Sequence, residues 1–224
     1  MVERSQICAD VIADCFRTVP RPGLWLHELA ATFIAAAIRV GCEMPSMMLL
    51  GCAPTMVQTH LDVEFRRIRD DDILLLEAEP KLFGYASQAV QTVSMRPLSA
   101  EEDGILKASQ TCFDGLFEAL KPGASYRDLI DQWNRTAKRE GWSAGRSMGH
   151  GLGLGQDLPW TTRSGLAFRH DMEVEEGDCF VLKPWIVNAA ETVSGRVGAP
   201  LVVEAGGARR LNTVDNSPLQ VIRG

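Results

Sequence analysis

The stretch Ser147–Pro159, SMGHGLGLGQDLP, decides how the rest of the chain is interpreted, because it sets a single histidine, His150, among four glycines. Glycines at alternate positions remove side chains from an extended backbone, so another chemical group can approach closely. An imidazole in such a clearing is well placed to meet a ligand. The same pattern also suits a glycine-rich turn that carries a surface histidine, and the remainder of the sequence has to decide between the two.

Composition and charge narrow the class of protein. The 224 residues are 46% hydrophobic and 23% charged, as in an ordinary soluble globular protein. A net charge of −6 without any Lys/Arg cluster argues against nucleic acid as a partner. No apolar run approaches the ~18–20 residues that span a bilayer, and the N-terminus lacks the layout of a signal peptide. The six cysteines are scattered among apolar residues, which predicts buried, reduced thiols in a cytoplasmic protein, with neither a zinc site nor a disulfide framework.

Apolar periodicity and helix breaks predict the same series of elements twice. In the first half, helices are expected over 4–18 and 25–40, and strands over 45–58, 73–78 and 83–93. In the second half, helices are expected over 99–120 and 125–140. They are followed by the glycine-rich stretch, a polar loop over 161–171 and strands near 179–182, 198–204 and 209–213.

Individual residues recur at fixed offsets between these halves. Gly41 returns as Gly141, 100 positions later, and Pro22-Gly23 returns as Pro122-Gly123. Glu77 returns as Lys183, 106 positions later, as Asp72 returns as Asp178. A duplicated α/β half predicts one sheet covered by helices, with a pseudo-twofold axis that brings matching strand ends into one cleft.

Three stretches, in this order along the chain, resemble the pita-bread superfamily of methionine aminopeptidases, proline-specific aminopeptidases and creatinases. They are DDILLLEAEPKLFGYASQAVQT at 71–92, GHGLGL at 149–154 and GDCFVLKPWI at 177–186. The resemblance implies an α+β pita-bread fold, with pseudo-twofold-repeated α/β halves and a curved antiparallel sheet covered by helices. It also implies that residues 1–224 form a single domain of the catalytic type, without the separate N-terminal lid domain of creatinase and the proline peptidases.

The same resemblance places the five metal-ligand positions of the peptidases, and most of them are changed. The two aspartates, the histidine and the two glutamates fall, in order, on Glu77, Gln88, His150, Lys183 and a position near Val197 or Gly198. A divalent ion needs several anionic or imidazole ligands around it, and an ammonium group would repel it. At ~4 Å and an effective dielectric near ~20, each pair of unit charges is worth on the order of 4 kcal/mol. We therefore expect a site without a metal or other cofactor.

Creatinase is the branch of this superfamily that works without a metal. Its proton-shuttling histidine, which precedes the first strand, falls on His60, and Phe83-Gly84-Tyr85 also matches that branch. Its catalytic glutamate and the neighbouring arginine, however, fall on Val90 and Gln91. Because a guanidinium substrate needs carboxylates, the resemblance argues against creatine itself as the substrate.

The expected catalytic residues are His60, His150, Lys183 and Glu77. Two imidazoles that face one cleft can give and take protons near neutral pH. Lys183 would replace the positive charge of the metals by orienting Glu77, binding a substrate carboxylate or stabilising an oxyanion. Alternatives remain open: His60 also suits a hydrogen-bonded interior histidine, and Lys183 with Glu77 also suits a buried ion pair that only fills the site.

The expected substrate-binding residues surround this group. Tyr85 and Asp157 are candidate hydrogen-bonding partners, and Asp157 stands where the peptidases have a second histidine. Trp185 would form an apolar wall beside Lys183, Gln88 holds the second ligand position, and Arg196 either binds an anion or faces water.

The resemblance, with these departures, implies a metal-independent, creatinase-like enzyme. It would perform histidine acid–base chemistry on a small polar substrate, with C–N hydrolysis as the expected reaction. A lyase or isomerase using the same histidines is the alternative, and so is a non-catalytic peptidase-like binding module. A cytoplasmic homodimer that binds a small molecule, and neither nucleic acid nor membrane, is the expected assembly.

Overall fold

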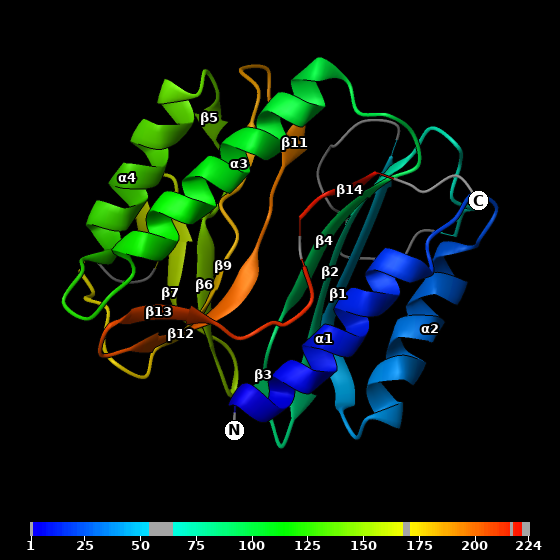
Figure 1. The fold of residues 1–224 in the computed structure, drawn as a ribbon, viewed down its shortest axis with the longest axis horizontal. Coiled ribbons are helices and arrows are strands. Elements are labelled where there is room, and N and C mark those ends of the chain that lie inside the picture. Colours follow the sequence, from blue (N-terminus) through cyan, green and yellow to red (C-terminus); the bar gives the residue numbers. More distant parts are fainter. Residues whose placement is uncertain (1, 54–64, 168–170, 216, 221–224) are drawn as a thin grey trace.

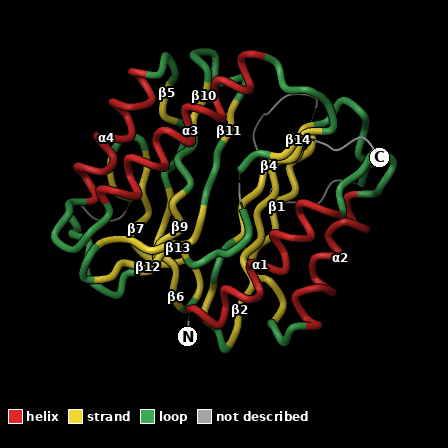
Figure 2. Tube along the Cα trace, viewed as in Figure 1, coloured by secondary structure: helices red, strands yellow, loops and turns green. Residues whose placement is uncertain are grey.

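The chain folds as two similar α/β halves that stand side by side. The computed structural model describes residues 2–53, 65–167, 171–215 and 217–220. In each half, two helices lie against one face of a strongly twisted sheet, and the helices of both halves share the same side of the molecule (Figures 1 and 2). Within the described residues, no helix is both long enough and apolar enough to cross a membrane.

The first half consists of two helices followed by an antiparallel sheet. Its elements are α1 (Val2–Thr18), α2 (Leu26–Arg39), β1 (Glu43–Ala53), β2 (Ile73–Leu82), β3 (Tyr85–Ala86) and β4 (Ala89–Ser94). The strands are ordered β1-β2-β4, and β3 pairs with the end of β2. The short strand β14 (Leu219–Gln220) comes back from the C-terminal part and adds to β4 in parallel.

The second half repeats the two helices and builds a larger sheet. Its elements are α3 (Ala100–Ala119), α4 (Tyr126–Arg139), β5 (Ser143–Ala144), β6 (Gly149–Gly153), β7 (Gly155–Thr162), β8 (Gly165–Ala167), β9 (Cys179–Leu182), β10 (Ile186–Val187), β11 (Ser194–Gly195), β12 (Ala199–Glu204) and β13 (Gly207–Arg210). The main sheet runs β13-β12-β9-β6-β7-β8, and β11-β10-β5 form a small second one.

The expected repeat is present in the hydrogen bonds as well as in the sequence. The amide of Gly23 donates to the carbonyl of Ile68, and the amide of Gly123 donates to the carbonyl of Val174. Val174 lies 106 residues after Ile68, the same offset that relates Glu77 to Lys183. Both glycines have a left-handed backbone, with φ of 85° and 82°, which a residue with a Cβ adopts only with strain. The carboxylate of Asp72 accepts the amide of Arg69, as that of Asp178 accepts the amide of Glu175. The two halves are therefore equivalent at the level of individual turns.

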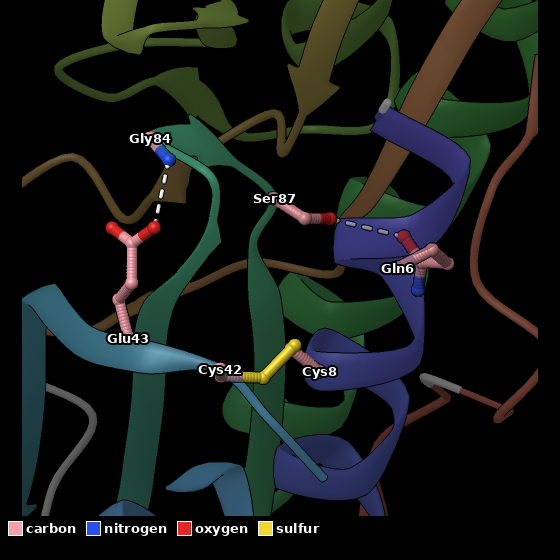
Figure 3. The surroundings of a disulfide bond; sticks show 6 residues. All are labelled: Gln6, Cys8, Cys42, Glu43, Gly84 and Ser87. Carbon is pink, nitrogen blue, oxygen red and sulfur yellow. Dashed lines mark hydrogen bonds between the residues drawn. A yellow bond between two sulfur atoms is a disulfide. The ribbon is translucent and has the colours of Figure 1, made fainter.

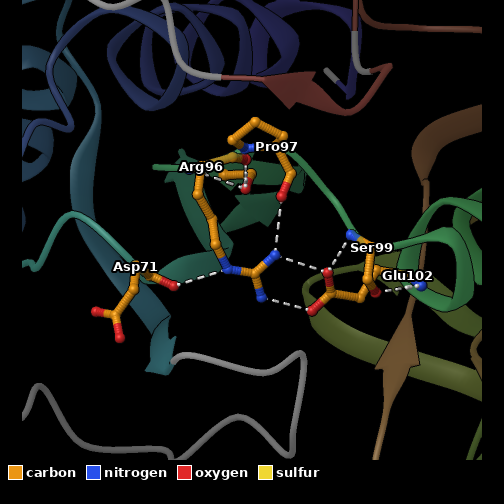
Figure 4. Close-up of polar contacts among 6 residues, drawn as sticks. Asp71, Arg96, Pro97, Ser99 and Glu102 are labelled. Atoms are coloured by element: carbon orange, nitrogen blue, oxygen red, sulfur yellow. Dashed lines mark hydrogen bonds and ion pairs between the residues drawn. The ribbon is translucent and has the colours of Figure 1, made fainter.

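Helix α3 begins at a well-formed cap that also ties the two halves together. The hydroxyl of Ser99 accepts the amide of Glu102, and the Glu102 carboxylate accepts the amide of Ser99, which is a capping box. The Arg96 guanidinium forms two hydrogen bonds of 2.8 Å to the same carboxylate and reaches the carbonyl of Asp71 in the first half (Figure 4). This bidentate contact anchors the crossover between the halves at the start of α3.

Each half has its own apolar core between its helices and its sheet. In the first half, Phe33 of α2 packs with Leu74 and Leu76 of β2; in the second half, Trp133 of α4 packs with Phe180 of β9. A small third cluster contains Val90 of the first half together with Leu152 and Val181 of the second, so it joins the two sheets. Alternate residues of β2 face the helices, which turns Glu77 toward the junction.

Cysteine pairing differs from the sequence-based expectation. Cys8 of α1 and Cys42, directly before β1, form a disulfide with Cα atoms 6.1 Å apart, and both residues are buried (Figure 3). The prediction of reduced thiols is therefore wrong for this pair. The other four cysteines, Cys15, Cys52, Cys112 and Cys179, are free. The pairing was missed because the two residues are 34 positions apart and only the packing of α1 against α2 brings them together.

One expected loop also differs. The polar segment predicted over 161–171 instead continues β7 to Thr162 and returns through β8, so it forms a hairpin. At the turn before β2, the Asp72 carboxylate is fully buried and lies 2.5 Å from Arg66 Nη2.

Candidate active site

A buried group of charges lies at the junction of the two sheets. Glu77 of β2 is 1% exposed, Lys183 directly after β9 is 9% exposed, and Arg196 before β12 is 3% exposed. Lys183 Nζ donates to Glu77 Oε2 at 3.1 Å, and Arg196 Nε lies 2.7 Å from Glu77 Oε1. The arginine contact is an ion pair without the alignment of a hydrogen bond. One carboxylate thus faces two cations, which we call the Glu77 cluster.

The protonation of this cluster follows from its burial and its charges. Burial on its own would raise the pKa of Glu77, but the charges of Arg196 and Lys183 outweigh it and hold that pKa below its usual value. Burial and the charge of Arg196 lower the pKa of Lys183, against the opposing effect of Glu77. The carboxylate is therefore ionised, while the ammonium group gives up its proton more readily than an exposed lysine does.

His150 lies on β6 beside this cluster and is neutral at pH 7. Burial, followed by the charge of Lys183, lowers its pKa to about 4. Its Nδ1 lies 2.9 Å from the carbonyl oxygen of Gly151, which can only accept, so Nδ1 carries the proton. Its Nε2 is buried and has no hydrogen-bond partner among the described residues. A neutral imidazole with a free Nε2 lone pair is the form that acts as a general base.

Neighbouring groups fix the orientation of the His150 ring. The indole of Trp160 stacks on it, with ring centres 5.0 Å apart and an angle of 16° between the planes. Gly149 lets the strand pass close to β9, because a Cβ at this position would collide with the carbonyl oxygen of Val181. Gly149 thus has the steric role expected from the sequence. The contact of Trp160 with His150 was not predicted, since a bulge between β6 and β7 sets that register.

The side chains at the family's metal-ligand positions do not fit a divalent cation. Lys183 and Arg196 bring positive charge to the carboxylate of Glu77, and Gln88 supplies only a neutral amide, which has no partner among the described residues. Gly198 stands against Lys183, where an added Cβ would lie 2.6 Å from the lysine Cβ, so the backbone leaves no room for a carboxylate. No three His, Cys, Asp or Glu side chains gather into a ligand set within the described ranges.

The remaining sequence-predicted residues divide into three groups. Trp185 does stand beside the charges, but as a cation–π partner: the Arg196 guanidinium lies 4.3 Å from its ring centre. Arg196 does not face water, so that alternative is wrong. Tyr85 lies on β3 and is half-buried, and Asp157 lies on β7 with its backbone opposite Gly151. His60 falls outside the described residues, so its predicted place in the cleft stays a prediction.

The fold is that of a pita-bread protein, and Glu77, Lys183 and Arg196 form a buried charged cluster at the junction of its two sheets. The sequence profile of metallopeptidase family M24 matches residues 1–214, and the chain belongs to this family. A curated relative, methionine aminopeptidase 1C, chloroplastic/mitochondrial, of Arabidopsis thaliana, is 23% identical over 197 residues. That match covers 82% of this chain and 55% of the relative.

Solved structures confirm the fold. The X-Pro aminopeptidase of Thermotoga maritima superposes with a TM-score of 0.87 at 17% identity, covering 98% of this chain and 61% of the other. The methionine aminopeptidase of Rickettsia prowazekii gives a TM-score of 0.79 at 14% identity, covering 93% and 95% of the two chains. The chain thus spans about half the length of the curated relative and about three fifths of the X-Pro aminopeptidase.

Proposed function

We propose that this chain is a hydrolase that cleaves a C–N bond in a small polar substrate without a metal ion. Membership of a peptidase family supports hydrolysis, and the three similar proteins described above carry the names of aminopeptidases. The observation that carries the proposal is the neutral His150, with its free Nε2, placed within the electrostatic influence of Lys183 and Glu77. A base and two cations are then available where the peptidases hold metal ions.

The proposed chemistry assigns one task to each group. His150 Nε2 accepts a proton from water as the water oxygen attacks the carbon of the C–N bond. Lys183 and Arg196 stabilise the negative charge that develops on the oxygen of the tetrahedral species. The protonated imidazole then gives its proton to the leaving nitrogen, and the C–N bond breaks. Glu77 holds both cations in place, and His60 is the proposed second proton carrier.

A non-catalytic binding module is the second candidate, and one observation favours it. Glu77 already pairs with both cations, so the cluster can equally stand as a self-sufficient structural replacement for the metal site. A lyase or isomerase would use the same His150 proton transfer on a different substrate. A hydrolase, a lyase or isomerase, and a binding module are distinguished by their products: the first forms the hydrolysis products of a C–N bond, the second forms other products, and the third forms none.

The deciding experiment is a product-resolved assay of small amides, ureas and amino acid derivatives in the presence of EDTA. We expect turnover by the unaltered chain and a loss of ~10²–10⁴-fold in kcat for His150→Gln. His27→Gln is the matched control, because His27 is exposed and stacks on Phe65 away from the cluster. Absence of turnover across the panel supports the binding module, whereas turnover that EDTA abolishes refutes the metal-independent mechanism.

A further inference from the structure

A cavity of about 240 Å³ opens next to the Glu77 cluster. It is lined by Arg146 before β6, by Thr162, Arg163 and Ser164 at the turn between β7 and β8, and by Trp185 and Glu191. Its volume lies below the range of ~300–1,000 Å³ typical of pockets for drug-sized ligands, so its ligand is small. The three contributing segments are far apart in sequence, which shows that the tertiary fold builds this space.

The charged side chains of this cavity favour an anion. Arg163 Nη1 pairs with Glu191 Oε1 at 2.6 Å, which leaves the exposed Arg146 with no ion-pair partner among the described residues. The cavity is therefore positive, although the whole chain carries a net charge of −6. Guanidinium groups match carboxylate and phosphate oxygens in shape as well as charge. The positive charge of this cavity therefore suits an oxyanion.

Trp185 connects the cavity to the Glu77 cluster. The indole lines the cavity, and the guanidinium of Arg196 packs over its ring. Burial lowers the pKa of Arg196 against the opposing charge of Glu77, and the charge of Arg146 adds to this lowering. Trp185 Nε1 and Arg196 Nη2 are both buried N–H donors without a partner among the described residues. Of these two donors, Trp185 Nε1 belongs to a ring that lines the cavity, and the described residues supply no acceptor for it.

We propose that this cavity binds an oxyanion, the carboxylate or phosphate group of a small ligand, with Arg146 as its main anchor. Thr162 and Ser164 also line the cavity, but Thr162 Oγ1 donates to the carbonyl of Gly165 and lies 3.1 Å from Ser164 Oγ, so the proposed contact rests on Arg146. If the proposed hydrolase function holds, the substrate is a small acid whose charged end sits here and whose C–N bond points toward the Glu77 cluster. This assignment of the substrate rests on the proposed function, whereas the binding of the anion does not.

Calorimetric titration of the full chain tests the site, with inorganic phosphate and succinate as separate probes at constant ionic strength. We expect saturable binding of at least one probe, and the tighter one identifies the oxyanion. Arg146→Gln should weaken that binding at least tenfold. The matched control is Arg139→Gln, which removes an exposed arginine paired with Glu140 at the end of α4 and changes the net charge equally. We expect less than a twofold effect from this control.

A fluorescence readout locates the ligand. Binding should change the tryptophan emission of the unaltered chain, and Trp185→Phe should remove that change. The proposal is overturned if neither probe binds, or if both arginine variants weaken binding equally, since the effect is then general electrostatics. Anion binding that depends on Arg146 without any turnover supports this site and contradicts only the proposed hydrolase. Turnover without anion binding supports the proposed hydrolase and contradicts this anion site.

Discussion

Glu77 and Lys183 occupy equivalent positions in the two halves, 106 residues apart, and their side chains meet at 3.1 Å in the interior. Arg196 adds a second cation to the same carboxylate, so the three side chains of the cluster carry a net charge of +1. This imbalance determines how the cluster should respond to substitution, to metal ions and to pH.

The stability of the cluster should depend strongly on which member is removed. Glu77→Gln leaves two buried cations side by side, and we expect a loss of about 3–5 kcal/mol in the free energy of unfolding. Lys183→Met leaves the neutral Glu77–Arg196 pair and should cost less than half of that. Urea denaturation measures both values. Lys107→Met, which removes an exposed lysine paired with Asp103, is the control, with an expected change of at most ~0.5 kcal/mol. A larger loss for Lys183→Met than for Glu77→Gln would contradict the charge count.

Divalent metal ions should have no effect on the unaltered chain. Dialysis against EDTA should leave the thermal midpoint and any activity unchanged, because Lys183 and Arg196 repel a cation from Glu77. Lys183→Glu places a second carboxylate beside Glu77 and His150, and we expect it to bind Co²⁺ or Mn²⁺ at least tenfold more tightly than the unaltered chain. Elemental analysis and calorimetry provide the measurements. Stoichiometric metal in the purified unaltered protein would refute this prediction.

Acid should destabilise the fold through His150. The pKa of His150 is lowered from 6.5 to about 4 in the folded chain, so between these values the unfolded chain binds more protons. The contribution of His150 to the free energy of unfolding is fully present above pH ~6.5 and is lost as the pH falls toward ~4. At ~1.4 kcal/mol for each pH unit, the total loss is about 3 kcal/mol. His150→Gln should flatten the pH profile of the unfolding free energy in this window. A pH profile of His150→Gln that equals that of the unaltered chain would contradict the assignment.

Gly149, directly before His150, should not accept a side chain without a loss of stability. Gly149→Ala brings a Cβ into the carbonyl oxygen of Val181 at a φ of 148°, so the loss of stability should exceed the ~1–2 kcal/mol of backbone strain alone. Gly123→Ala supplies the comparison, because its φ is also positive but nothing lies within 4 Å of the added atom. Denaturant titration measures both losses. Equal losses for both variants would show that the close approach of β6 to β9 does not add to the cost of a side chain at Gly149.

Reduction of the Cys8–Cys42 disulfide should lower the stability of the first half. A crosslink over 34 residues is worth ~2–4 kcal/mol through its restriction of the unfolded chain. Dithiothreitol should therefore lower the thermal midpoint of the unaltered chain and leave that of Cys8→Ser unchanged. Thiol titration of the denatured, unreduced protein should find four free cysteines, whereas six would show that the bond does not form.

The sequence predicted the elements better than the contacts. Helix breaks at Pro-Gly pairs and the repeated offsets of 100 and 106 residues were sufficient for the paired α/β halves, since turn chemistry is local. Lys183 and Glu77 could be paired in advance because the repeat relates their positions. The contact of Arg196 with Glu77 and the stacking of Trp160 on His150 could not, because both depend on loop paths and a bulge that no sequence spacing reveals.

The meeting of Glu77 with Lys183 also bears on why the halves are joined in one chain. In a symmetric dimer of identical halves, equivalent positions carry the same residue, so this contact would place two glutamates or two lysines against each other. A single gene for both halves allows each position to change independently of the other. Two identical halves cannot place opposite charges at these equivalent positions, and a separated half would lose this contact on self-association.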